Sequence, residues 1–430
     1  MRIVELNAET TRQILSDLLK RSPNHYTEYE QSVQEIITAV RERGDAALFS
    51  YTEKFDGAKL RADTVEVTKE EFDEAYAACD EKLLDVIRKS RENIRIFHEK
   101  QKVNSWFDAG VQGTIVGQKV TAIERAGVYV PGGKAAYPSS VLMNIIPAKV
   151  AGVDEIIMCT PCDKEGKVTP ATLAAAKEAG VDRVFKVGGA QAIASMAFGT
   201  ESIPKTDKIV GPGNIYVALA KKAVFGYVSI DSIAGPSEIL VLADETAHAH
   251  YVAADLLSQA EHDELASAIL ITTSRRLAEE VNVEIEAYLK KLSRREIIEK
   301  SLENYGYILL ADSEDAAIDA ANAIASEHLE IVTANPFETM TKIRNAGAIF
   351  LGEYSSEPLG DYFAGPNHVL PTNGTAKFFS PLSVDDFIKK SSVISYSKEA
   401  LESVYQDIAQ FAECEHLTAH ANSVRVRFEE

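Results

Sequence analysis

Short apolar runs alternate with alanine-rich stretches of helical periodicity through most of this chain, starting near residue 106. A first series of predicted strands covers 126–130, 154–158, 183–187 and 208–210, and a second covers 238–242, 268–272, 306–310, 330–333 and 348–351. Strands that alternate with helices are typical of a parallel sheet with helices on both faces. The pattern therefore predicts an α/β fold with two Rossmann-like parallel-sheet units.

Both ends of the chain have a different, mainly helical pattern. Helical apolar spacing with many charges occurs in residues 10–20, 26–55 and 69–101, and we expect His25 and His98 to lie on the surface. The whole pattern predicts a helical N-terminal extension (1–105), a first α/β unit (106–236), a second α/β unit (237–378) and a helical C-terminal tail (379–430).

Composition and net charge exclude some classes of binding partner and indicate the cellular compartment. The 430 residues carry a formal net charge of −20, which argues against nucleic acids and anionic membranes because both bind basic patches. No apolar run is long enough to cross a membrane, and the N-terminus has no apolar signal core. The cysteines are too few for a disulfide framework, so we expect a cytoplasmic protein. They are Cys79, Cys159, Cys162 and Cys414.

The segment 255–263 carries a pair of residues that suits a metal ion. It has helical spacing, and Gln259 and His262 lie three positions apart, so their side chains leave the same helix face. An imidazole and an amide oxygen suit zinc but lack a carboxylate, and alone such a pair is more often solvated surface. The polar loop 359–372 offers Asp361 as a third ligand, and His368 is an equally good ligand on chemistry alone.

Glu327 and His328 form an adjacent acid and base at the end of an alanine-rich helix, just before a predicted strand. Such a pair can transfer protons if both side chains face a cleft. Neighbours on a helix diverge by about 100°, so the two would more naturally serve different steps. Sites of open α/β sheets gather after strands, so this position requires a site assembled between two domains.

Three glycine-rich turns follow strands of the first unit, at 131–133, 188–191 and 211–214. They fit a nucleotide at a helix N-terminus or merely tight connections, and no G-x-G-x-x-G fingerprint follows a strand. Cys159 and Cys162 form a single C-x-x-C, for which two free thiols are the favoured interpretation. Ser237 and Glu238 stand at the junction of the units and fit either a substrate pocket or a turn.

Four segments, taken together and in order, resemble the histidinol dehydrogenase family: 232–238, 255–263, 326–330 and 365–372. The likeness runs from about Arg125 to Val424. It implies a zinc- and NAD-dependent enzyme of histidine biosynthesis, which oxidises L-histidinol through L-histidinal to L-histidine and reduces two NAD. Two alternatives stay open: a dehydrogenase of a related amino alcohol, and a zinc hydrolase with the same ligands.

The resemblance also implies the site residues and the assembly. One zinc ion per subunit falls on Gln259, His262, Asp361 and His420. The acid–base pair is Glu327 and His328. The substrate contacts comprise these six residues with Ser237 and Glu415. The NAD contacts fall on Tyr129, Gln191 and Asn214. The family is a homodimer in which the tail reaches the partner's site, so Glu415 and His420 would act across the interface.

One position departs from the family pattern. Glycine is usual where this chain has His416, and a non-glycine residue with positive φ is strained. We therefore expect a different local turn here. His416 and His420 lie four positions apart and could share a helix face, and we favour His420 as the ligand.

Overall fold

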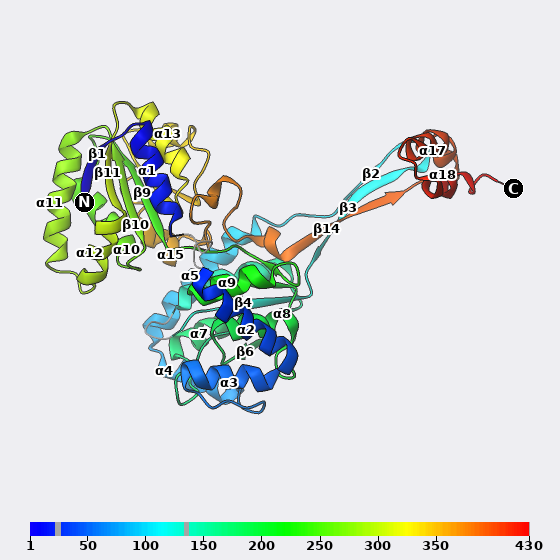
Figure 1. Ribbon diagram of the computed structural model, residues 1–430, viewed down its shortest axis with the longest axis horizontal. Helices are drawn as coiled ribbons and strands as arrows, with labels where there is room; N and C mark the ends of the chain where they lie inside the picture. The colour runs from blue at the N-terminus through cyan, green and yellow to red at the C-terminus, as the bar shows by residue number, and fades with distance from the viewer. Residues whose placement is uncertain (22–26, 133–136, 430) are drawn as a thin grey trace. The chain divides into compact units, whose positions relative to one another are not determined.

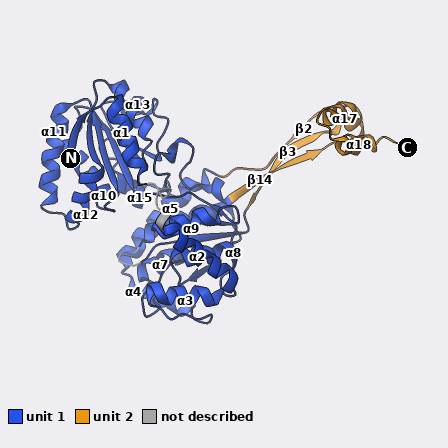
Figure 2. Cartoon of the chain, in the orientation of Figure 1, with its two compact units in different colours: residues 1–101, 123–387 blue, residues 102–122, 388–430 orange. Residues whose placement is uncertain are grey.

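The computed structural model describes residues 1–21, 27–132 and 137–429. Its contacts divide the chain into two compact units, which Figure 2 distinguishes by colour. Unit 1 comprises Met1–Gln101 and Ile123–Phe387, and unit 2 comprises Lys102–Ala122 and Ile388–Glu430. Among the helices of the described residues, none combines the length and apolarity needed to cross a membrane.

The first sheet of unit 1 is parallel and five-stranded. Its spatial order is β6 (Arg183–Phe185), β5 (Glu155–Cys159), β4 (Arg125–Tyr129), β7 (Lys208–Val210) and β8 (Ser229–Ile230). The connecting helices are α6 (Pro138–Ala151), α7 (Pro170–Ala179), α8 (Gly189–Phe198) and α9 (Ile215–Val224). Four N-terminal helices pack on them: α2 (Thr27–Arg43), α3 (Asp45–Asp56), α4 (Lys69–Ala78) and α5 (Glu81–Glu99).

The second sheet of unit 1 is also parallel and has six strands. Its spatial order is β1 (Arg2–Glu5), β11 (Gly306–Leu310), β10 (Ser267–Thr272), β9 (Glu238–Ala243), β12 (His328–Val332) and β13 (Ala348–Leu351). Helices α10 (Ala249–Ala260), α11 (Arg275–Leu289) and α12 (Arg295–Tyr305) share one core with Ile239 and Val241 of β9. Helices α1 (Ala8–Leu19) and α13 (Glu314–Ile324) share a second hydrophobic core with Leu240 and Leu242 of the same strand. The strand is therefore buried on both faces, as parallel strands usually are.

Both predicted parallel sheets are confirmed, and each predicted strand begins or ends within two residues of the observed one. The N-terminal region is not purely helical, because β1 pairs with β11 at the edge of the second sheet. Figure 1 shows this blue strand beside the green ones. β1 has four residues, too few for a periodicity that would distinguish a strand.

Unit 2 is a three-stranded antiparallel sheet with a helical end. Its elements are β2 (Trp106–Ala109), η2 (Val111–Gly113), β3 (Ile115–Ala122), β14 (Ile388–Ser395), α16 (Lys398–Glu402), α17 (Tyr405–Cys414) and α18 (Thr418–Arg425). The helical tail is confirmed, but a strand precedes its helices, and residues 106–122 pair with that strand instead of joining the first α/β unit. Most residues of these strands are partly or fully exposed, so they lack the buried, apolar pattern that predicted the other strands.

The expectation that His98 lies on the surface is wrong, whereas His25 lies outside the described residues. His98 is fully buried on the apolar face of α5. Its Nδ1 lies 2.8 Å from the carbonyl oxygen of Ile94, and its Nε2 lies 3.3 Å from the amide nitrogen of Asn367. The spacing of four from Ile94 places the imidazole on the same helix face, where both nitrogens find partners.

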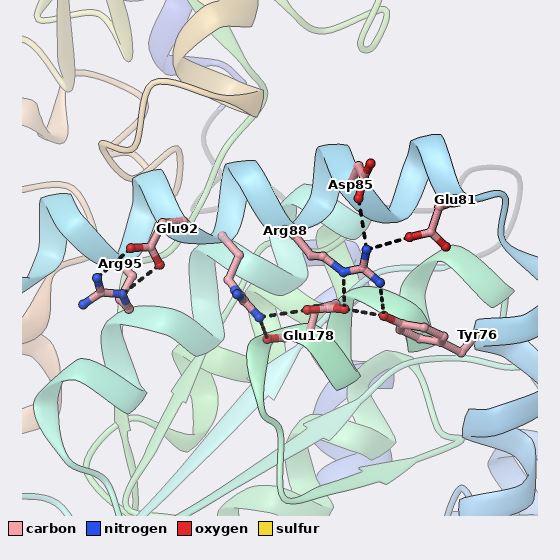
Figure 3. A network of polar contacts seen from close by, with 8 residues as sticks. Tyr76, Glu81, Asp85, Arg88, Glu92, Arg95 and Glu178 are labelled. Atoms are coloured by element: carbon pink, nitrogen blue, oxygen red, sulfur yellow. Dashed lines mark hydrogen bonds and ion pairs between the residues drawn. The ribbon is translucent and has the colours of Figure 1, made fainter.

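A polar network joins α4, α5 and α7 (Figure 3). Glu178, near the end of α7, accepts hydrogen bonds from Tyr76 at 2.5 Å, Arg88 at 3.1 Å and Arg91 at 2.8 Å. The pKa of Glu178 is lowered from its ordinary value of 4.5: burial raises it, but the hydrogen bonds from Tyr76 and Arg88 and the charge of Arg91 outweigh burial. The ionised carboxylate therefore stabilises the packing of α4 and α5 on α7.

Glu178→Gln should lower the free energy of unfolding by about 1 kcal/mol at neutral pH, since the arginines that it pairs with are partly exposed. Because the folded pKa is depressed, the wild-type contribution is full above pH 4.5 and is lost as the pH falls through the lower folded value. Urea unfolding at several pH values should give a difference that shrinks in acid. A matched control is Glu92→Gln, which breaks only an exposed pair with Arg95. A difference that is constant with pH would contradict this account.

The expected change of turn at His416 does not occur. The residue has φ 60°, and its N–H donates to the carbonyl oxygen of Glu413, while the N–H of Leu417 donates to that of Ala412. These are the two hydrogen bonds of a Schellman ending of α17, in which glycine is the usual left-handed residue. The turn is kept, with an imidazole-bearing residue in a strained conformation.

His416→Gly should stabilise unit 2 by about 0.5 kcal/mol, because relief of the left-handed strain exceeds the extra backbone entropy of glycine in the unfolded chain. Thermal unfolding followed by circular dichroism measures the effect. His416→Ala is the control, since it removes the imidazole but keeps the strain. If the alanine variant is as stable as the glycine variant, the backbone explanation is wrong.

Candidate functional site

A pocket of about 880 Å³ in unit 1 is lined by residues from both parallel sheets. Every predicted site residue of this unit lines it: Tyr129, Gln191, Asn214, Ser237, Gln259, His262, Glu327, His328 and Asp361. Sequence reasoning did not single out the contribution of α3, whose last residues Phe55 and Asp56 also line the pocket. A pocket of this size can take a substrate and part of a larger cofactor.

The first sheet presents the carboxyl ends of its strands to this pocket. Tyr129 ends β4, Gln191 lies in the first turn of α8 after β6, and Asn214 caps α9 after β7. Glycine at position 211 lets the chain after β7 pass close to the end of β4. A Cβ at this position, where φ is +115°, would lie 2.0 Å from the carbonyl oxygen of Tyr129. Within the described residues no side chain caps α8 at Gly188, and the N–H of Gly189 donates to Tyr129 Oη, so the later N–H groups of this first turn are the ones that can receive an anionic group. Gly133, in the first glycine-rich turn, lies outside the described residues.

The second sheet presents the opposite, amino ends of its strands. Ser237 precedes β9, Glu327 precedes β12, and His328 is the first residue of β12, paired with Ile239 of β9. Helix α13 ends at Ile324, so the acid and base do not lie on a helix. Glu327 and His328 can line the pocket although they lie at the start of a strand, because the pocket lies between the two sheets.

The main chain of Glu238 orients the acid and the base. Its N–H donates to Glu327 Oε2 at 2.9 Å, and its carbonyl oxygen lies 2.9 Å from His328 Nδ1. A carbonyl oxygen only accepts, so Nδ1 carries the hydrogen and the neutral ring keeps its lone pair on Nε2. His328 Nε2 has no hydrogen-bond partner within the described residues and lies 3.6 Å from Asp361 Oδ1. The imidazole is thus held with its basic nitrogen toward Asp361.

Burial and neighbouring charges shift the pKa values of this pair. Burial raises the pKa of Glu327 to about 8, although His328 opposes the shift. Burial acts to lower the pKa of His328, but the carboxylates of Glu327 and Asp361 outweigh it and raise the value to about 10. Strong shifts from a stated cause, inside a pocket, are typical of groups that exchange protons during a reaction.

Three candidate metal ligands line this pocket. Gln259 is in the last turn of α10, and His262 follows in a turn whose N–H donates to the carbonyl oxygen of Gln259 at 3.2 Å. Gln259 Oε1 is buried without a hydrogen-bond partner in the part of the chain that is described. Asp361 belongs to α15 (Glu357–Tyr362), and despite burial its pKa is lowered to about 2 by His328 and His368. An orphaned amide oxygen, an imidazole and an ionised carboxylate fit a divalent cation such as zinc.

A different group, His328, Glu357 and Asp361, also brings three ligand atoms within 4.8 Å of one another. Glu357 is the weaker ligand, because burial and then Asp361 raise its pKa to about 8, and it already accepts a hydrogen bond from Ser258 at 3.0 Å. Of the two neighbouring carboxyl groups, Asp361 is therefore the ionised one. Gln259, His262 and Asp361 line the same pocket and stay the predicted ligand set.

Hydrogen bonds of His368 favour Asp361 over His368 as the metal ligand, a choice that the sequence leaves open. His368 Nδ1 lies 3.0 Å from the main-chain oxygen of Asp361, and its Nε2 lies 3.3 Å from Ser140 Oγ. Both ring nitrogens are occupied, so the imidazole supports Asp361 instead of offering a lone pair. Such partners behind a ligand are common in metal sites.

The remaining predicted site residues, Glu415 and His420, belong to unit 2. Glu415 caps the end of α17, His420 lies on α18, and both side chains are exposed. The cysteines of the C-x-x-C are free thiols, as favoured. Burial raises the pKa of Cys162 to about 11 and that of Cys159 still further, so neither is a reactive thiolate.

Comparison with known proteins agrees with this geometry. The family model for histidinol dehydrogenase matches residues 19–428. A histidinol dehydrogenase from Bacillus subtilis is 58% identical over 410 residues, covering 95% of this chain and 96% of the relative. One from Clostridium acetobutylicum is 54% identical over 428 residues, covering 100% and 99%. The crystal structure of the enzyme from Elizabethkingia anophelis matches with a TM-score of 0.93 at 38% identity, covering 100% of this chain and 98% of that one. The chain therefore belongs to the histidinol dehydrogenase family.

Proposed function

We propose that this protein is a zinc- and NAD-dependent enzyme that oxidises L-histidinol through L-histidinal to L-histidine. The observation that carries the proposal is that one pocket gathers the unit 1 residues which the family resemblance assigns to zinc, NAD and proton transfer. The family acts in histidine biosynthesis. The chemistry expected of a histidinol dehydrogenase agrees with the residues that line the pocket. No observation favours either alternative, a dehydrogenase of a related amino alcohol or a zinc hydrolase.

Zinc would be held by Gln259 Oε1, His262 and Asp361, with His420 as a further ligand. When bound, the ion would orient the imidazole and amine of the substrate. Ser237 lines the same pocket and suits a contact to the substrate. Glu415 carries a negative charge that suits the cationic amine. These groups would fix the carbon that is oxidised relative to His328 and Glu327.

NAD would lie along the carboxyl ends of the first sheet, where Tyr129, Gln191 and Asn214 line the pocket. When bound, it accepts the hydride in each of the two oxidations. Tyr129 is buried, and its hydroxyl accepts a hydrogen bond from Gly189 N at 3.1 Å, so it also fixes the start of α8. Gln191 Oε1 is buried and lacks a partner within the described residues, which leaves it available to an amide or hydroxyl donor.

His328 and Glu327 would divide the proton transfers. With Asp361 bound to zinc, its charge would no longer hold a proton on His328, so the neutral Nε2 would take the alcohol proton as hydride leaves the carbinol carbon. Glu327 then takes a proton from water, which adds to the aldehyde, and the resulting hydrate gives up the second hydride. Separate roles agree with the geometry, because the two side chains are held by different groups of one residue, Glu238.

A homodimer with exchanged tails would complete the site. Unit 2 leaves large apolar side chains exposed on both its sheet and its helices: Trp106, Phe107, Val111, Ile115, Val116, Ile394, Ile408, Phe411, Leu417 and Val426. Exposed apolar surface of this extent is typical of an interface. Glu415 and His420 lie in this unit and would reach the partner's pocket. The free thiols agree with the cytoplasmic location that we propose.

Each L-histidinol consumed should yield two NADH, and a zinc chelator should abolish the reaction until zinc is restored. Absorbance of NADH against substrate consumed, with metal content measured in parallel, tests both statements. A yield of one NADH would contradict the aldehyde step and the role of Glu327. Activity that survives complete loss of zinc would contradict the metal dependence.

His328→Asn should slow oxidation of the alcohol by about 100-fold or more while zinc stays bound, because a general base is lost and no ligand is. Glu327→Gln should slow the oxidation of L-histidinal more than that of L-histidinol. Both follow from the separate proton transfers and are measured by supplying each substrate in turn. Loss of zinc from His328→Asn, or equal slowing of both steps by Glu327→Gln, would contradict these roles.

A further inference from the structure

A buried ion pair lies directly behind the acid–base pair. Arg21 follows α1, and its side chain is fully buried. Its Nη2 donates to Glu238 Oε1 at 2.5 Å, and its Nη1 donates to the carbonyl oxygen of Leu265 at 2.7 Å. Glu238 is the first residue of β9 and is 3% exposed. Neither residue lines the pocket, so the pair cannot bind substrate directly.

Glu238 is the link from this ion pair to the chemistry. Beyond the two main-chain contacts described above, its carboxylate Oε2 accepts a hydrogen bond from the N–H of Glu327 at 3.4 Å. One residue therefore holds the carboxylate of Glu327, the backbone of Glu327 and Nδ1 of His328. A displacement of Glu238 would move all three contacts together.

The charge of Arg21 keeps Glu238 in this position. A carboxylate buried without a cation is strongly unfavourable, so it turns toward water or draws water in. The two donors of Arg21 reach two different strand ends, at Glu238 and at Leu265 just before β10. The guanidinium thus fixes the start of β9 against its neighbour, which a single ammonium cannot do with the same geometry.

We propose that Arg21 and Glu238 form a positioning pair for this reaction: the ion pair fixes the start of β9 so that the main chain of Glu238 aims Glu327 and selects the tautomer of His328. The inference rests on the proposed function of those two residues. Arg21 comes from the N-terminal region, which contains none of the site residues predicted from the sequence. A purely structural pair would stabilise unit 1 equally well without affecting the rate of the folded enzyme.

The test compares Arg21→Met, Arg21→Lys and the double variant Arg21→Met/Glu238→Met in the full-length enzyme with zinc. For each, kcat and KM are measured for L-histidinol, L-histidinal and NAD, together with the thermal midpoint. Arg21→Met should lower kcat for both substrates by about 100-fold, the loss expected from a displacement of about 1 Å, while KM for NAD changes by less than about twofold. Arg21→Lys should recover part of kcat, because it restores the charge but not both donors.

The double variant and a remote pair separate positioning from stability. Replacing both partners with apolar side chains removes the uncompensated charge, so the double variant should regain the thermal midpoint but not kcat, since the carboxylate contact to Glu327 is gone. Lys186→Met breaks another largely buried pair, with Glu71, and should lower the midpoint without lowering kcat. If all Arg21 variants lose thermal stability with kcat unchanged, or if kcat follows the midpoint across the series, the positioning role is wrong.

The variants Glu327→Gln and His328→Asn keep this result distinct from the function itself. If they alter the two oxidation steps as proposed and Arg21→Met does not alter kcat, only the positioning inference fails. If they leave both steps unchanged, the proposed roles of the acid and base fail, whatever the Arg21 variants do.

Discussion

The parallel pairing of β9 with β12 is the constraint on which the site depends. It sets His328 opposite Ile239, one residue from Glu238, and so brings two segments about 90 residues apart in the sequence into hydrogen-bond contact. Both strands are buried on both faces, and a slip of one residue would turn every side chain to the opposite face. The register that packs the sheet therefore also fixes the tautomer of His328 and the direction of the Glu327 carboxylate.

The two sheets present opposite ends of their strands to the pocket. This explains why the residues proposed to bind the cofactor and those proposed to transfer protons come from different sheets. The carboxyl ends of parallel strands, where helices begin, are the usual place for the phosphates of a dinucleotide. The amino end of β9 instead presents the main-chain groups of Glu238 to the acid and the base at the start of β12, and residues that follow α10 and belong to α15 line the same pocket. One pocket thus combines two different environments, each supplied by one sheet.

Much of this arrangement can be predicted from the sequence, and the exceptions have physical causes. Buried strands such as β9 carry continuous apolar runs, so the local pattern predicts them, whereas the ligand roles of Gln259, His262 and Asp361 are what the resemblance implies and stay predictions. β14 and β2 are exposed strands without such runs, and their pairing with β3 is not visible in local patterns. His98, Glu357 and Arg21 were missed because their roles depend on partners distant in the sequence. Ala325 illustrates the same limit: it adopts a left-handed conformation just ahead of Glu327, which no local signal predicts.

The N-terminal strand β1 has a consequence for how the chain folds during synthesis. Its partner β11 is made roughly 300 residues later, which corresponds to about 15–60 s of translation. When β1, α1 and Arg21 leave the ribosome, the other strands of the second sheet and Glu238, the partner of Arg21, have not yet been made. The second sheet can therefore close only late, after the first sheet has emerged in full. A chaperone that shields the first twenty residues would act on the segment that waits longest for its native contacts.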